Sequence, residues 1–201
     1  MTIVARPTLA ANTPAELIAY LKQGGKSVNL AHAGLGAASQ LCGMLLQQSV
    51  GAEATTVPYQ GTAPALTALM AGQVDVMCDQ TTQTLPFIKA NKIKLYGVTT
   101  KERLKQLGDT PTLREVGLKD FEVVVWHGLY LPKGTPAAVS DRMNAALRAA
   151  LRGPELVKRL DELGVKVAAP NLQTPDGLKS QLTAEIQRWT TLIRAAGAYA
   201  D

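Results

Sequence analysis

Short apolar segments alternate with stretches of helical spacing through the first hundred residues, and Gly, Pro or Asn separates them. The expected strands are 2–5, 28–31, 54–57, 74–78 and 94–99, and the expected helices are 14–24, 37–49, 63–71 and 82–90. Alternation at this pace is typical of βαβ units. It predicts an α/β fold built on a parallel sheet with right-handed crossovers.

The second part of the chain does not continue the regular alternation of strands and helices. Residues 101–117 are polar and rich in turn formers, and we expect a connecting loop with a brief helix that begins at Asp109. An extended run over 121–131 precedes helices over 136–151 and 154–163, a strand over 165–168 and a final helix over 174–196. The final helix has an apolar stripe at helical spacing, which predicts a buried face. The stripe consists of Leu178, Leu182, Ile186, Trp189 and Ile193.

Composition excludes several classes of protein. The 201 residues carry a formal charge of +5, but Lys and Arg are scattered and never form a run of five, so we expect no nucleic-acid partner. No stretch approaches the length of apolar sequence that a membrane span needs, and residues 1–6 show no secretory pattern. Cys42 and Cys78 permit either one disulfide or a buried pair of free thiols.

Small residues fill the turn between the expected strand 28–31 and the next helix. The turn contains Ala33, Gly34, Gly36, Ala37, Ala38 and Ser39. Such a turn lets an anion approach the main-chain N–H groups at a helix start, so we expect it to hold a carboxylate or phosphate. A purely structural turn is the alternative. No Gly-Lys-Ser or Gly-Lys-Thr follows and a third glycine is missing, so nucleotide cofactors are disfavoured.

Two further strand ends carry candidate residues. Gly61 and Thr62 lie between a strand and a helix, where Thr62 could cap the helix in an ordinary turn or help to bind a ligand. Asp79 follows the apolar strand 74–78, at the end of the sheet where α/β proteins bind ligands. A cap for the next helix is the alternative role of Asp79.

The residues do not indicate an enzyme, a metal site or a cofactor site. Neither His32 nor His127 has a second ligand at metal spacing. No Gly-x-Ser-x-Gly motif occurs, and no cysteine has a basic neighbour that would activate it. We therefore expect a binding protein that uses no metal and no cofactor.

Several blocks occur in a fixed order along the chain. They are the segments 28–41, 57–79 and 126–136, with Val-Pro-Tyr-Gln-Gly at 57–61, Gly-Gln-Val-Asp-Val-Met at 72–77, Thr-Pro-Thr at 110–112, Arg-Trp at 188–189 and Ala-Ala-Gly at 195–197. In this order and with these gaps, they resemble the Bug-type extracytoplasmic receptors of the tripartite tricarboxylate transporter family. The resemblance covers essentially the whole chain. It implies a two-lobed, type II periplasmic-binding-protein fold that closes on a small carboxylate like a Venus flytrap and delivers it to membrane permease subunits. It also implies a periplasmic location.

The resemblance also assigns roles by position. The small residues of the turn 33–39 would form one wall of the site, Gly61 and Thr62 another, and Asp79 would face the distal or amino group of the ligand. Trp126 and His127 would lie near the hinge. Ala37, Ala38, Gln40 and Gln60 stand where the family often has other polar residues, which implies a shifted ligand preference.

Family members usually begin well upstream with a signal peptide and a glycine-rich loop. The resemblance therefore implies one lobe that is complete over 5–122 and a partial lobe over 123–201, without its leading half. Exposed apolar surface on such a partial lobe predicts a dimer or a strand swap. The alternative function is a cytoplasmic ligand-sensing regulatory domain for a small organic acid, and an enzyme acting on an acid is a weaker third hypothesis.

Overall fold

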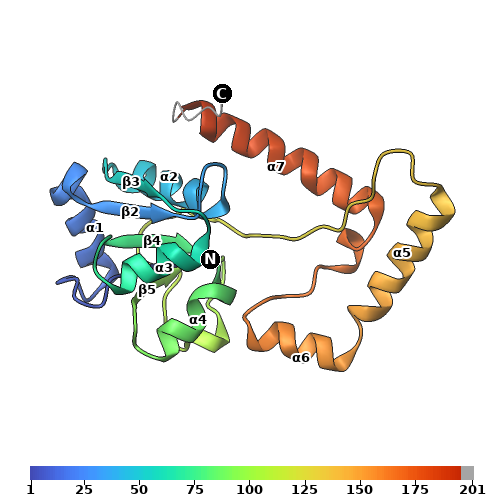
Figure 1. The fold of residues 1–201 in the computed structure, drawn as a ribbon, viewed down its shortest axis with the longest axis horizontal. Helices are drawn as coiled ribbons and strands as arrows, with labels where there is room; N and C mark the ends of the chain where they lie inside the picture. The colour runs from blue at the N-terminus through green and yellow to red at the C-terminus, as the bar shows by residue number, and fades with distance from the viewer. Residues whose placement is uncertain (196–201) are drawn as a thin grey trace. The chain divides into compact units, whose positions relative to one another are not determined.

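The computed structural model describes residues 1–195 and divides them into two compact units (Figure 1). The first unit extends from Met1 to Val125, and the second begins at Trp126. Phe121 and Val123 are buried and belong to the first unit, so the observed division lies three residues beyond the expected one. Each unit is described by itself.

The first unit is an α/β domain whose helices cover a five-stranded sheet. Its elements are β1 (Thr2–Ala5), α1 (Pro14–Gly24), η1 (Gly25–Ser27), β2 (Asn29–His32), α2 (Ala38–Val50), β3 (Thr55–Pro58), α3 (Thr62–Met70), β4 (Val76–Asp79), α4 (Thr81–Lys89), β5 (Lys94–Val98) and η2 (Lys105–Leu107). The five expected strands and four expected helices are confirmed, and no end differs from its expected position by more than two residues. Thr13 caps α1 and accepts a hydrogen bond from the Glu16 N–H, as the Thr-Pro start predicts.

The strand order is β3-β2-β4-β1-β5. β2 pairs in parallel with β3 and β4, but β1 lies antiparallel between β4 and β5. The prediction of a parallel sheet is therefore wrong for β1, although β2 to β5 all run in one direction. All four residues of β1 are buried, and burial on both faces says nothing about strand direction.

Alternate residues of the strands face two different helical layers. Val4, Ala31 and Met77 pack with α3 in one core cluster, to which Phe87 and Ile88 of α4 add their side chains. α1 and α2 lie on the opposite face, where Cys42 of α2 forms a disulfide with Cys78 of β4 across a Cα–Cα distance of 6.0 Å. Of the two possibilities that the sequence left open, a disulfide and a buried pair of free thiols, the structure therefore has the disulfide.

Asp75 ties three strands together just before β4. Its Oδ1 accepts a hydrogen bond from Arg6 Nε at 2.8 Å, and its Oδ2 accepts one from the Asn29 N–H at 2.8 Å. The Arg6 N–H also donates to the Asp75 carbonyl. This network fixes the ends of β1, β2 and β4 at the edge of the sheet opposite the strand ends discussed below.

The connection after β5 differs from the expected one in detail. Its brief helix, η2, lies at Lys105–Leu107, before the expected start at Asp109. Thr112 begins a turn in which its hydroxyl accepts from the Glu115 N–H while the Glu115 carboxylate accepts from the Thr112 N–H. Val98 and Thr112 form an isolated bridge, so this loop returns to the edge of the sheet.

The second unit contains α5 (Ala137–Ala150), α6 (Pro154–Glu162), η3 (Pro170–Leu172) and α7 (Pro175–Ala195). No side chain described between 126 and 194 is buried. The expected buried stripe of α7 is therefore wrong; Ile186, for example, is 56% exposed. The expected strand over 165–168 is also wrong, and 121–131 forms no strand, because neither segment forms a ladder of hydrogen bonds with another strand in the described chain. The Val123 N–H donates to the Thr99 carbonyl, but no ladder continues from this bond. Ala196 and Gly197 lie outside the described residues.

Within residues 1–195, every helix is too short or too polar to cross a membrane.

Candidate functional site

Three helix starts meet at one edge of the sheet in the first unit. β2, β3 and β4 are parallel, so their carboxyl ends lie at the same edge. Each strand leads through a short turn into α2, α3 or α4. The first N–H groups of a helix have no acceptor within the helix and carry its positive dipole end. The topology therefore gathers three sets of such donors in one place.

The first turn, residues 33–37, uses several of its own N–H groups. Ala33 N–H donates to Ser39 Oγ at 2.9 Å, Gly36 N–H to Gln40 Oε1 at 2.7 Å, and Ala37 N–H to the Gly34 carbonyl at 3.2 Å. The Gly34 N–H contacts His32 Nδ1 at 3.3 Å. Within the described chain, the donors left without a partner are those of Leu35, Ala38 and Ser39. These three are the N–H groups that a ligand could use.

The second turn is hydrogen-bonded to the first. Tyr59 N–H donates to the His32 carbonyl at 2.9 Å, and Gly61 N–H donates to the Ala33 carbonyl at 3.1 Å. Gly61 has φ +108°, a conformation that L side chains rarely adopt, and it is the N-cap of α3. Thr62 is thus the first residue of α3 and not its cap. The N–H groups of Thr62 and Ala63 have no partner among residues 1–195.

Asp79 ends β4 at the third turn and is only 1% exposed. Its Oδ2 accepts from Thr62 Oγ1 at 2.9 Å and its Oδ1 accepts from the Gln80 N–H at 2.6 Å. Burial raises the pKa of the Asp79 carboxyl, and these two hydrogen bonds oppose the rise. Asp79 does not cap α4, whose N-cap is Gln80; the N–H groups of Thr81 and Thr82 find no acceptor in the described chain.

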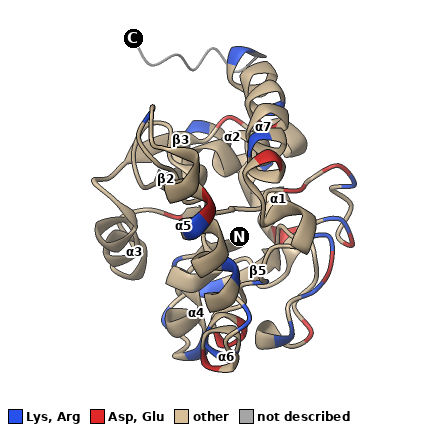
Figure 2. Cartoon of the chain, turned by 90° about the vertical axis from the view of Figure 1, so that its right-hand side faces the viewer, with Lys and Arg blue, Asp and Glu red and all other residues tan. Residues whose placement is uncertain are grey.

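The three turns contain no Lys or Arg over residues 33–40, 59–64 and 79–84, and Asp79 is their one charged side chain. α3 has no charged residue at all (Figure 2). An anion at these helix starts would therefore be bound by main-chain N–H groups and helix dipoles. A small carboxylate suits such donors, since it accepts several hydrogen bonds through two oxygens.

The disulfide lies close to this edge of the sheet. Cys78 precedes Asp79 in β4, and Cys42 lies one turn into α2 from Ala38. Both cysteines are fully buried. The bridge therefore fixes the start of α2 against the strand that leads into the third turn.

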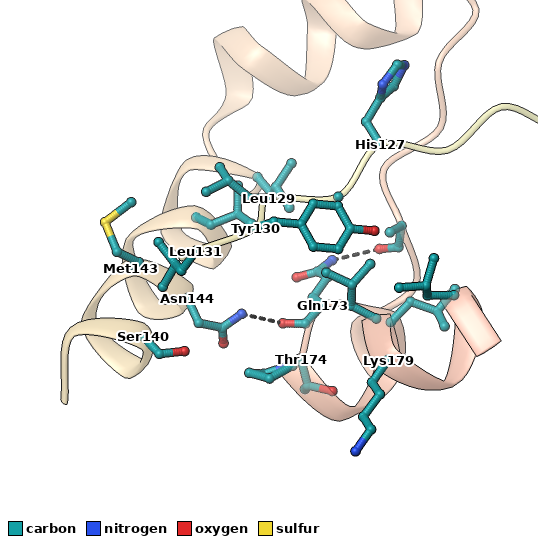
Figure 3. Close-up of a pocket in the computed structure, with 18 residues that line it drawn as sticks. His127, Leu129, Tyr130, Leu131, Ser140, Met143, Asn144, Gln173, Thr174 and Lys179 are labelled. Atoms are coloured by element: carbon teal, nitrogen blue, oxygen red, sulfur yellow. Dashed lines mark hydrogen bonds between the residues drawn. The ribbon is translucent and has the colours of Figure 1, made fainter. Parts of the chain in front are cut away.

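Trp126 and His127 belong to the second unit, whereas the three turns belong to the first. Trp126 is half-buried, and His127 is exposed at the rim of a cavity of about 340 Å³. Apolar side chains of 129–131 and Met143 of α5 line this cavity, and Asn144 donates to the Gln173 carbonyl at 3.0 Å (Figure 3). Leu129 and Tyr130 are more than half exposed, so the cavity is the uncovered apolar side of this unit.

The described residues contain no group of three or more His, Cys, Asp or Glu side chains that could hold a metal ion.

Sequence reasoning missed several donors at this edge. The free N–H groups of Leu35, Ala63, Thr81 and Thr82 were not singled out, while those of Ala33, Gly36 and Gly61 are used inside the protein. Helix boundaries alone could have identified the free donors of Ala63, Thr81 and Thr82, because the first residues of any helix have unpaired N–H groups. The hydrogen bonds that the side chains of Ser39 and Gln40 accept from Ala33 and Gly36 form only in the folded turn.

Comparison with known proteins gives a consistent family assignment. The profile of the tripartite tricarboxylate transporter family receptor matches residues 1–198. A protein in the TAR-I ttuE-ttuC' intergenic region of Agrobacterium vitis is 45% identical over 197 residues. That match covers 98% of this chain and 57% of the relative, so the chain spans little more than half of that protein's length.

Solved structures show the same fold. The periplasmic binding protein BugD superposes with a TM-score of 0.93 at 42% identity, over 100% of this chain and 67% of BugD. MatC from Rhodopseudomonas palustris with bound malate superposes with a TM-score of 0.90 at 36% identity, over 96% of this chain and 65% of MatC. The fold is therefore that of a periplasmic binding protein, with one complete lobe and one partial lobe.

Proposed function

This chain belongs to the receptor family of the tripartite tricarboxylate transporters, and we propose on that basis that it captures a small carboxylate in the periplasm for membrane permease subunits. The family consists of solute-binding receptors, which agrees with the lack of catalytic motifs in the sequence. The malate in MatC supports a carboxylate as the class of ligand.

The observation that carries the proposal is the set of free N–H groups at three adjoining helix starts. Ala38 and Ser39 of α2, Thr62 of α3 and Thr81 of α4 belong to this set. A ligand carboxylate that bridges two of the turns would satisfy donors that the protein leaves unpaired. Gly34, Gly36 and Gly61 contribute the positive-φ turns that expose these donors.

Two predicted site residues enter the proposal through the family resemblance alone. Trp126 and His127 begin the second unit, and we propose that they contribute to the ligand site of the family-length protein. Substitution of either residue would test that role by its effect on ligand affinity.

A proline substitution tests whether a main-chain N–H holds the ligand. Ala38 is the first residue of α2, where proline is tolerated, and Ala37 before it has φ −66° and ψ 149°, which suits a following proline. Ala38→Pro therefore removes one free donor and leaves the helix intact. Hydrogen bonds to charged groups contribute roughly 1.5–3 kcal/mol, so ligand affinity should fall on the order of tenfold or more.

Isothermal titration with a panel of monocarboxylic, dicarboxylic and amino acids is the measurement. Ala137→Pro, at the first position of α5, is the matched control and should leave affinity unchanged. Binding to the unaltered chain that Ala38→Pro does not weaken would refute main-chain capture. If none of the acids in the panel binds measurably, this result would count against the proposed function itself.

We also infer self-association through the second unit. Leu129 is 53% exposed, Tyr130 56% and Met143 43%, although all three line an apolar cavity. A second copy could cover such a surface. Small-angle X-ray scattering should show a dimer, and a monodisperse monomer would contradict this inference.

A further inference from the structure

Asp79 is the one charged side chain at the three turns, yet it is almost inaccessible. It is 1% exposed, and both of its carboxylate oxygens accept hydrogen bonds from the protein. A group that contacts a ligand directly must present an atom to the site. The Asp79 carboxylate instead faces Thr62 and the Gln80 N–H.

The two hydrogen bonds of Asp79 join two helix starts. Thr62 is the first residue of α3, and Gln80 is the N-cap of α4. The distances of 2.9 Å to Thr62 Oγ1 and 2.6 Å to the Gln80 N–H leave little freedom between the second and third turns. The free N–H groups of Thr62, Ala63, Thr81 and Thr82 lie within one or two residues of these contacts.

A second layer of hydrogen bonds holds the same backbone from behind. The Thr2 hydroxyl donates to the Asp79 carbonyl at 3.2 Å and lies 2.8 Å from the Thr84 hydroxyl. The Thr84 hydroxyl in turn lies 3.2 Å from the Gln80 carbonyl. Thr2 and Thr84 are completely buried, so the main chain at 79–80 is fixed on both sides.

We propose that Asp79 and Thr62 form a buried latch that positions the free N–H groups of the second and third turns for the ligand carboxylate. Asp79 is then a positioning residue, in contrast to the direct contact with an amino or distal group that the family resemblance implies. The inference rests on the proposed function and deepens it. It predicts that Asp79 does not distinguish acids with an amino group from acids without one.

Four variants separate the latch from a ligand contact. Asp79→Ala and Thr62→Val break the Asp79 to Thr62 hydrogen bond. Asp79→Asn keeps the shape of the side chain, with an amide oxygen for the Gln80 N–H and an amide N–H for the Thr62 hydroxyl. Thr62→Ser keeps the hydroxyl. Thr67→Val is the matched control, since the Thr67 hydroxyl bonds only the Ala63 carbonyl within α3.

The first measurement uses the protein without ligand. Exchange of the hydrogen-bonded amides of Gly61, Gln83 and Thr84 should become at least about tenfold faster in Asp79→Ala and Thr62→Val, because local opening governs the exchange of bonded N–H groups. Asp79→Asn, Thr62→Ser and Thr67→Val should exchange at these positions like the unaltered protein. Circular dichroism confirms that each variant is folded. Unchanged exchange in Asp79→Ala and Thr62→Val overturns the latch, whether or not any acid binds.

The second measurement compares aspartate with succinate by isothermal titration. The two acids differ by one amino group, so a latch predicts that Thr62→Val weakens both by the same factor, about tenfold, and that Asp79→Asn weakens neither. Selective loss of aspartate binding in Asp79→Asn would make Asp79 a ligand contact and overturn the inference. If the unaltered protein binds neither aspartate nor succinate, the proposed function is contradicted for these two acids. The hydrogen-exchange measurement then still shows whether the Asp79–Thr62 latch exists.

Discussion

Reduction of the Cys42–Cys78 disulfide should destabilise the first unit substantially. The bridge joins residues 36 positions apart, from α2 to β4, and both sulfurs lie in the buried core. In the chain-entropy account, closing a loop of this length in the unfolded state contributes about 4 kcal/mol at 25 °C. For a unit of this size that corresponds to a fall in melting temperature of at least about 8 °C.

Urea unfolding of the oxidised and the reduced protein measures this difference directly. The Cys42→Ala/Cys78→Ala double variant is the control: reductant should not change its midpoint, and its stability should lie somewhat below that of the reduced protein because of the cavity it adds. Titration of free thiols before unfolding confirms the state of each sample. An unchanged midpoint on reduction, with both thiols shown to be free, would refute the chain-entropy reasoning.

Three other substitutions test the architecture around the site. Asp75→Ala leaves the Asn29 N–H without an acceptor and should lower the free energy of unfolding in urea by about 2 kcal/mol; an unchanged midpoint would contradict this. Gly61→Ala forces an L residue to φ +108° and should lower stability by about 1–3 kcal/mol and weaken ligand binding, whereas Gly72→Ala, at the other end of α3, should affect stability alone. Because burial raises the pKa of Asp79, its ionised form lowers stability at neutral pH and this cost disappears as the pH falls. Asp79→Asn should therefore be at least as stable as the unaltered protein at about pH 7, with the difference shrinking toward about pH 4; a clear loss at neutral pH would show that the reasoning is wrong.

Local sequence signals were sufficient for most elements of the first unit. Thr13-Pro14 marked the start of α1, and the alternation of apolar runs and helical spacing located all five strands. The same signals failed where a segment depends on a distant partner. Residues 165–168 have the composition of a strand, but strand formation requires a neighbouring backbone, and the described chain offers none there.

In the candidate site too, local sequence predicted some features, and others depend on the folded chain. The small residues of the turn 33–39 could be recognised because strand-to-helix turns have a characteristic composition. The sequence could not show which of their N–H groups stay free, because the side chains of Ser39 and Gln40 accept hydrogen bonds from Ala33 and Gly36 only in the folded turn. The pairing of Thr62 with Asp79, 17 residues apart, likewise exists only once β3 and β4 stand in one sheet.

By itself the sequence determined the α/β class, the order of the helices and strands in the first unit, the three small-residue turns and the family resemblance. These properties follow from periodicity and turn chemistry, which act over a few residues. Tertiary structure alone decided the antiparallel course of β1, the disulfide, the incomplete burial of the apolar stripe of α7 and the burial of Asp79. Each of these depends on which distant segments meet, and hydrogen-bond and packing partners far apart in the chain leave no local pattern to read.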